Sequence, residues 1–92
     1  LGQWRAALAR PAALVLLETP SNPMLEIVDL PAVAALAHAA GAIVVVDNVF
    51  ATPLLQKPLE MGADVVVYSC TKHMDGQGRV LGGAVLGRAK WV

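Results

Sequence analysis

The sequence predicts an α/β fold built around a three-layer, mostly parallel β-sheet. Three observations predict it: short apolar runs without alternation, helix signals between these runs, and turn-forming residues at their junctions. Unalternating runs rich in β-branched residues are typical of parallel strands that are buried on both faces. Such runs, separated by helical segments, indicate successive βαβ units.

The first unit begins with the apolar run "ALVLLE" at residues 13–18, which predicts a strand. The following "TPSNP" has two prolines and an Asn in five residues, and therefore predicts a loop. Asp29 as N-cap, Pro31 in the first turn and Gly41 just past the end predict a helix over residues 30–40.

The second half repeats the pattern. Residues 42–46, "AIVVV", predict another buried strand, and "TPLLQKPLEMG" predicts one or two helical turns interrupted by Pro58. Residues 63–69, "ADVVVYS", predict a third strand, and residues 82–87 predict a last one. Because crossovers between parallel strands are right-handed, the carboxyl ends of the first three strands are expected at one edge of the sheet.

The composition indicates the inner part of a larger domain. The chain is 57% hydrophobic and 15% charged, whereas average soluble chains are about 45–50% apolar and about 25% charged. The sequence begins with Leu1 and has no initiating Met. We therefore expect residues 1–92 to be an internal fragment of a domain, with no complete domain boundary within the chain.

Charge and cysteine content argue against several classes of protein. The formal net charge is zero and Lys and Arg do not cluster, which disfavours nucleic acid and anionic membranes as partners. No apolar run reaches the roughly 18 residues that span a bilayer, and no signal peptide is visible. The single Cys70 excludes an internal disulfide, and the two histidines lie too far apart for a metal site. We expect a cytoplasmic protein.

Polar residues gather where the first three predicted strands end. Glu18, Asp47 and residues 69–72 follow these strands, and open α/β sheets bind ligands at their carboxyl ends. Lys72 is either a solvated surface residue, as an isolated lysine after a strand usually is, or a nucleophile. A neutral lysine amine attacks a carbonyl to form a Schiff base, and the polar neighbours favour this second interpretation.

Asp47 indicates which cofactor such a lysine would hold. A carboxylate directly after five apolar residues normally requires a cationic partner, and a pyridinium nitrogen would provide one. Pyridoxal phosphate needs both a lysine and such an acidic partner. Ser69 and Thr71 offer hydroxyls for its phosphate, or are ordinary turn residues that bond to their own backbone.

Four motifs of the sequence resemble, in order, those of the cysteine and methionine metabolism family of pyridoxal-phosphate enzymes. They are "ETPSNP", "VVVDNVFATP", "GADVVVYSCTK" and "GQGRVLGG", and they lie within residues 13–87. The resemblance to this cystathionine γ-synthase-like group implies part of the large domain of a fold type I transferase. It also implies a homo-oligomer, a dimer of dimers, for the complete enzyme.

The resemblance also implies a role for each matching site residue. Lys72 would form the Schiff base with the cofactor and act in catalysis, and Asp47 would pair with the pyridinium nitrogen. Ser69 and Thr71 would bind the phosphate. Asn22, which is as far from Asp47 along the chain as Asp47 is from Lys72, would lie near the 3-hydroxyl of the cofactor and the substrate. No metal is implied.

Two positions depart from the family pattern. Cys70 stands where Ala or Thr is usual, and His73 where Tyr is common. Neither position carries the chemistry: Cys70 is expected to be a small buried side chain, and His73 to pack or bond locally. Arg79 is open between a structural role, a substrate contact and a contact with a neighbouring subunit.

Within the family, "DGQGRVLGG" is most similar to the corresponding segment of the O-succinylhomoserine sulfhydrylases. This implies γ-replacement on an activated homoserine ester, with sulfide giving homocysteine in methionine biosynthesis. Cystathionine γ-synthase and cystathionine or methionine γ-lyase activity are the alternatives within the family. A cofactor-free Schiff-base lyase and a non-catalytic remnant are the alternatives outside it. The fragment alone is expected to be inactive.

Overall fold

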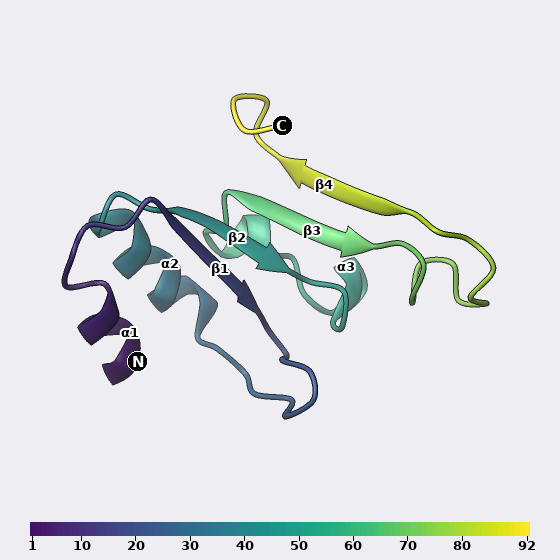
Figure 1. Cartoon of the computed structure of the whole chain (residues 1–92), viewed down its shortest axis with the longest axis horizontal. Coiled ribbons are helices and arrows are strands. Elements are labelled where there is room, and N and C mark those ends of the chain that lie inside the picture. The colour runs from purple at the N-terminus through teal and green to yellow at the C-terminus, as the bar shows by residue number, and fades with distance from the viewer.

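The computed structural model describes residues 1–92 as one four-stranded sheet with helices packed against it (Figure 1). The strands lie side by side in chain order, and the first three are parallel whereas the last runs antiparallel to its neighbour. The predicted α/β fold with a mostly parallel sheet is confirmed. The strands are β1 (Leu14–Glu18), β2 (Ile43–Asp47), β3 (Val65–Ser69) and β4 (Gly83–Gly87).

The helices are short, and only one of them has more than two turns. They are α1 (Gly2–Ala7), α2 (Leu30–Ala39), α3 (Thr52–Leu55) and the 3₁₀ helix η1 (Pro58–Met61). Helix α2 begins as predicted, because the Asp29 side chain accepts a hydrogen bond from the backbone N–H of Ala32 at 3.1 Å. None of the helices has the length and apolarity that crossing a membrane would require.

Helix α1 is the one element that has no predicted counterpart. It has six residues and no side-chain cap, and none of its residues is fully buried. Its Trp4, together with Leu8 just beyond it, packs against the hydrophobic core. The helix therefore forms through this tertiary packing, which a local sequence pattern does not reveal.

One face of the sheet carries the hydrophobic core. Val44, Val46 and Val66 on this face are almost completely buried and pack with Leu30 and Val33 of α2 in a cluster of 12 residues. Burial of each such side chain contributes about 1.5–3 kcal/mol. The core joins the sheet to α2 and fixes the orientation of the strands.

Helix η1 lies beside α2, and Gly62 makes this close packing possible. Its φ is +106°, in a region that favours glycine, and an added Cβ would lie 3.0 Å from the Cβ of Ala34 in α2. The 3₁₀ helix therefore ends where the backbone touches the neighbouring helix.

No helix of the chain covers the opposite face of the sheet. Leu16 of β1 and Val85 of β4 point to this face and are 65% and 60% exposed. The sequence pattern predicts strands buried on both faces, and β1 departs from it because these 92 residues supply the sheet and a single layer of helices. This uncovered face ends at the strand edge where the predicted site residues lie.

Candidate active site at the carboxyl edge of the sheet

The strand register brings the polar residues of the first three strands together. Glu18 lies opposite Asp47, and Asp47 lies opposite Val67, which precedes Ser69 by two positions. Because side chains two residues apart in a strand point to the same face, Glu18, Asp47 and Ser69 share the uncovered face. The expectation that the strand ends collect these residues at one edge is confirmed.

The carboxylate of Asp47 is half-buried and has no cationic partner in the chain. Its only side-chain hydrogen bond is with the backbone N–H of Val49, which donates to Oδ1 at 3.0 Å. Glu18 beside it accepts a hydrogen bond from the backbone N–H of Asn22 at 3.2 Å. Two neighbouring carboxylates thus lie on the uncovered face, and each can accept further hydrogen bonds.

Lys72 lies in a compact turn that follows β3. The Cys70 carbonyl accepts a hydrogen bond from the N–H of Asp75 at 3.0 Å, and the Lys72 carbonyl accepts one from the N–H of Gly76 at 2.9 Å. The Lys72 side chain is exposed and forms no ion pair. The backbone of the turn is therefore held by hydrogen bonds, whereas the Lys72 amine is free to react or to bind a ligand.

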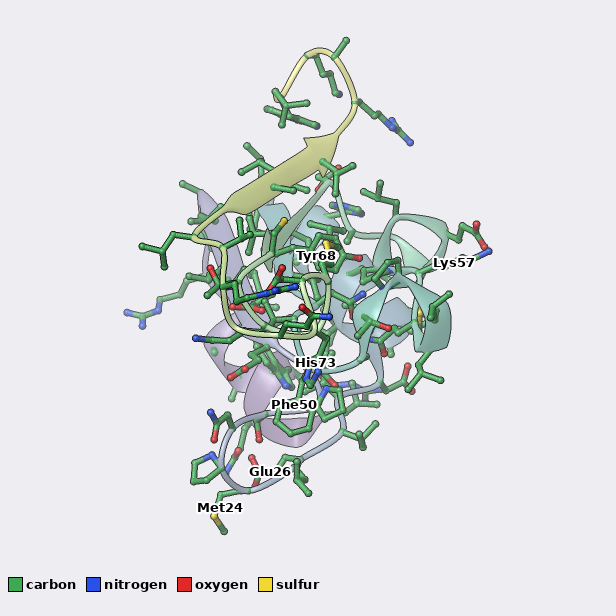
Figure 2. The ribbon with its side chains drawn as sticks, turned by 90° about the vertical axis from the view of Figure 1, so that its right-hand side faces the viewer. Met24, Glu26, Phe50, Lys57, Tyr68 and His73 are labelled. Atoms are coloured by element: carbon green, nitrogen blue, oxygen red, sulfur yellow. The ribbon has the colours of Figure 1, made fainter.

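A contact between aromatic rings joins this turn to the loop that follows Asp47. The rings of Phe50 and His73 meet edge-on, with centroids 6.3 Å apart and an angle of 68° between their planes (Figure 2). His73 directly follows Lys72, so the lysine turn and the aspartate loop lie against each other. The expected local packing role of His73 agrees with this contact.

The two hydroxyls proposed for phosphate differ in their surroundings. Ser69 makes no side-chain hydrogen bond within the chain, whereas the Thr71 hydroxyl accepts one from the N–H of Gly82 at 3.2 Å. Its contact with the Gly82 carbonyl is long, at 3.5 Å, and is weak by the usual criteria. Thr71 therefore has the turn-stabilising role that the sequence left open, and its hydroxyl hydrogen remains available to another acceptor.

The remaining candidates lie at the periphery of the edge. The Asn22 side chain is exposed and makes no hydrogen bond within the chain. Arg79 is exposed and contacts Asp75 only through its backbone N–H, at 2.9 Å. Cys70 is half-buried, with Sγ 3.5 Å from the sulfur of Met74.

Comparison with known proteins identifies the family. A family model for the Cys/Met metabolism PLP-dependent enzymes matches residues 1–92. The chain belongs to this family. It is 64% identical over 92 residues to an O-succinylhomoserine sulfhydrylase of Mycobacterium tuberculosis and covers 23% of that protein. It is 50% identical over 84 residues, or 91% of its length, to a cystathionine γ-synthase of Escherichia coli, and covers 22% of it.

The solved structures of the family have the same fold in this region. A methionine γ-lyase from Micromonospora echinospora superimposes with a TM-score of 0.92 at 54% sequence identity. The match covers 96% of this chain and 25% of the lyase. The chain thus spans about a quarter of the length of the relatives that it matches.

The residues at the edge fit the pyridoxal phosphate on which this family depends. Asp47 offers a half-buried carboxylate without a cation, which is the partner that a protonated pyridine nitrogen needs. Ser69 on the same face has a hydroxyl without a hydrogen-bond partner in the chain, and the Lys72 amine forms no ion pair. The carboxylate, the hydroxyl and the amine therefore fit, respectively, the ring nitrogen, the phosphate and the aldehyde of this cofactor.

The sequence did not predict a buried polar network that lies directly beneath this edge. Asn48 is completely buried, and its side chain is hydrogen-bonded to Gln56 and Tyr68. A local signal for Asn48 exists, because it is two residues after Val46 and therefore falls on the core face of the strand pattern. No local signal exists for Gln56, which comes from a separate segment.

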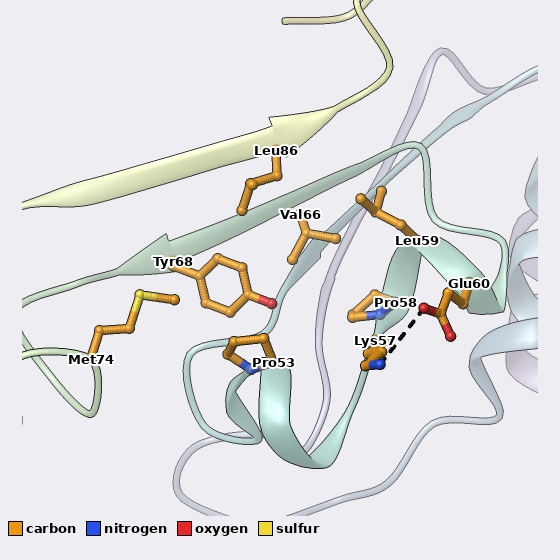
Figure 3. A pocket seen from close by; sticks show the side chains of 9 residues that line it. All are labelled: Pro53, Lys57, Pro58, Leu59, Glu60, Val66, Tyr68, Met74 and Leu86. Atoms are coloured by element: carbon orange, nitrogen blue, oxygen red, sulfur yellow. Dashed lines mark ion pairs between the residues drawn. The ribbon is translucent and has the colours of Figure 1, made fainter.

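An apolar pocket lies on the core face of the sheet, opposite to the face that carries Asp47 and Ser69. It has a volume of about 390 Å³ and is bounded by Val66, Tyr68 and Leu86 of the sheet, by the segment from α3 to η1, and by Met74 (Figure 3). An ion pair between Lys57 and Glu60, 3.9 Å apart, lies at its border. None of the predicted site residues lines the pocket, although Met74 comes from the turn that carries Lys72.

Proposed function

We propose that residues 1–92 form an internal part of the cofactor-binding large domain of a pyridoxal-phosphate-dependent trans-sulfuration enzyme. The observation that carries the proposal is the Asp47 carboxylate. It is half-buried at the end of an apolar strand, without a cation, on the same face as Ser69 and near the turn that holds Lys72. The uncovered apolar face of the sheet supports the view that further parts of the protein pack here.

Each edge residue has a distinct part in the proposed chemistry. When bound, pyridoxal phosphate supplies an electron sink for charge at the α-carbon of an amino acid. Asp47 would keep the proton on the ring nitrogen, and the Ser69 and Thr71 hydroxyls would donate hydrogen bonds to the phosphate. Lys72 Nζ would bind the aldehyde carbon. Once the substrate amine displaces it, it would accept and return protons at the α- and β-carbons.

Asn22 completes the proposed site from the neighbouring loop. Its exposed carboxamide lies on the loop that follows β1, and its backbone N–H donates a hydrogen bond to Glu18 at the end of that strand. Strand β1 lies next to β2, which ends in Asp47. A side-chain amide both donates and accepts hydrogen bonds. We assign it to the 3-hydroxyl of the cofactor and to the bound substrate.

For the reaction, we infer γ-replacement on O-succinylhomoserine with sulfide, which gives homocysteine and succinate. The segment "DGQGRVLGG" and the 64% identity to a sulfhydrylase support this choice over synthase or lyase activity. In the balanced reaction, a carbon–oxygen bond at the γ-carbon breaks, succinate leaves with the electron pair, and sulfide forms the new carbon–sulfur bond.

The test uses the full-length protein that contains this chain. After pyridoxal phosphate is added, the visible absorbance of a lysine-bound cofactor should appear, and absence of this band would contradict the cofactor assignment. O-succinylhomoserine is then supplied with sulfide, with cysteine or with no thiol. Faster formation of homocysteine than of cystathionine or of elimination products is the expected result. Cystathionine or an oxo acid as main product would indicate synthase or lyase activity instead.

A further inference from the structure

We propose that Gln56 is a positioning residue that holds the loop carrying Asn22 against the strand ends that carry Asp47 and Ser69. The inference rests on the proposed function, because it concerns the same edge of the sheet. Gln56 follows α3, and its side chain reaches back beneath the edge from the core side.

The side-chain amide of Gln56 bridges the ends of β1 and β2. Its Nε2 donates to the Thr19 carbonyl at 2.8 Å and to Asn48 Oδ1 at 2.9 Å. Thr19 directly follows the end of β1, and Asn48 directly follows Asp47. A single nitrogen therefore sets the distance between the loop that leaves β1 and the strand end that bears the candidate pyridinium partner.

Asn48 extends the bridge to β3. Its Nδ2 lies 2.9 Å from the Tyr68 hydroxyl and 2.9 Å from the Gln56 carbonyl, and Tyr68 immediately precedes Ser69. Thr19 and Asn48 are completely buried and Gln56 is half-buried, so solvent has limited access to these hydrogen bonds. The three strand ends are thus tied together on the face opposite to the one that Asp47 and Ser69 share.

The network accepts an amide at position 56 in one orientation only. If the Gln56 amide were reversed, its oxygen would face the Thr19 carbonyl and the Asn48 oxygen. A glutamate carboxylate would place oxygens against these same two acceptors and would add a partly buried negative charge. Substitution by Glu therefore breaks the bridge with almost no change in side-chain volume.

The bridge acts on the loop that carries Asn22 through its hydrogen bond to Thr19. The Thr19 hydroxyl accepts a hydrogen bond from the N–H of Val28 at 3.0 Å, so Thr19 holds both ends of the loop between β1 and α2. The tip of this loop is exposed, with Met24 at 73% (Figure 2). Gln56 therefore anchors a solvent-exposed loop at its base, in addition to the hydrogen bond that Glu18 accepts from the Asn22 N–H, and loss of this anchor should displace groups on the loop. Small displacements of such groups reduce rates strongly.

Loop attachment is tested first, by amide hydrogen exchange on the full-length protein without cofactor. The variants are Gln56→Leu and Gln56→Glu, and the matched control is Gln77→Leu, at an exposed glutamine between β3 and β4. We expect exchange at residues 19–28 to be about tenfold faster in the Gln56 variants, as loss of an anchoring hydrogen bond allows, while exchange in α2 stays unchanged. Exchange at residues 19–28 equal to that of the control would overturn the proposal.

Activity of the cofactor-loaded protein gives the second readout. The Gln56 variants should lose about tenfold in kcat/KM, and the circular dichroism of the bound cofactor should change, whereas a purely structural role would alter only the melting temperature. In the double variant with Asn22→Ala, the two losses should not add, because Gln56 acts through the Asn22 loop. Additive losses would contradict this route.

The two proposals fail in distinguishable ways. If Asn22→Ala leaves kcat/KM unchanged, the role proposed for Asn22 is wrong, while the exchange experiment still decides whether Gln56 anchors the loop. If Gln56→Leu does not fold, Thr19→Val removes only the hydroxyl that accepts from Val28 and should accelerate exchange at the same residues. Unchanged exchange in Thr19→Val would then count against the anchor.

Discussion

Asp47 and Glu18 occupy matching positions on adjacent parallel strands, and neither carboxylate is in an ion pair. Like charges directly opposite each other destabilise a sheet. The chain places this pair on the face that its own helices leave uncovered, at the edge where Lys72 follows β3. A cation bound against Asp47 would relieve the repulsion, which is why this pair supports a pyridinium site.

The first prediction concerns the charge of Asp47. In the full-length protein, Asp47→Asn should keep the bound cofactor but lose about 10²–10³-fold in kcat, since a neutral amide cannot hold a proton on the ring nitrogen. Absorbance and steady-state turnover measure the two effects. Asp29→Asn is the matched control, because Asn caps α2 as well as Asp does. Turnover of Asp47→Asn equal to wild type would refute the role.

The second prediction concerns the amine of Lys72. Lys72→Ala should abolish the visible absorbance of the lysine-bound cofactor and nearly all turnover, because no other lysine follows a strand at this edge. Lys57→Ala is the control, since Lys57 is exposed and forms only a long ion pair with Glu60, at 3.9 Å. If Lys72→Ala kept both the band and the activity, Lys72 would be an ordinary surface residue.

The strands, and the position of the candidate site residues at one edge of the sheet, were predictable from the sequence because their signals are local. Runs such as residues 42–46 lie within one residue of the observed strands. Asp47 follows such a run directly and Lys72 lies three residues after the end of another, so the parallel topology was enough to bring them to one edge. The helix over residues 30–40 was predictable for the same reason, since cap, proline and glycine lie within the segment itself.

The parts that could not be predicted depend on contacts between distant segments. Gln56 bonds to a carbonyl 37 positions earlier in the chain, and nothing in its own neighbourhood distinguishes it from a surface glutamine. Helix α1 forms against the core without a cap of its own. The free hydroxyl of Ser69 and the engaged one of Thr71 likewise differ because only Thr71 meets Gly82, at the start of the next strand.

The third prediction concerns acid stability. Burial raises the pKa of Asp64, but the Val44 N–H at 2.9 Å and the His38 ring at 2.8 Å donate hydrogen bonds to its carboxylate, and His38 and Arg88 add positive charge. The net effect holds this pKa below its ordinary value of 3.8. A lowered carboxyl pKa stabilises the fold above the ordinary value, and this contribution is lost as pH falls through the lowered one.

Urea unfolding of the full-length protein at several pH values measures this contribution. Asp64→Asn should be less stable than wild type by about 1 kcal/mol at neutral pH. The gap should narrow as pH falls below 3.8, because wild-type Asp64 then becomes protonated. Asp29→Asn serves again as the control for the change in charge. A gap that is constant over the whole pH range would show that the ionised form of Asp64 contributes nothing.

The last prediction concerns residues 1–92 produced on their own. The uncovered face and the two edge strands should make this chain self-associate and bind pyridoxal phosphate weakly, because exposed edges and apolar faces pair with other chains. Size-exclusion chromatography and a cofactor titration measure both properties. Leu16→Lys should reduce self-association more than Leu54→Lys does, since Leu54 is 90% exposed but lies on α3, outside the uncovered face. A sharp monomer peak with micromolar cofactor affinity would mean that these residues form a domain of their own.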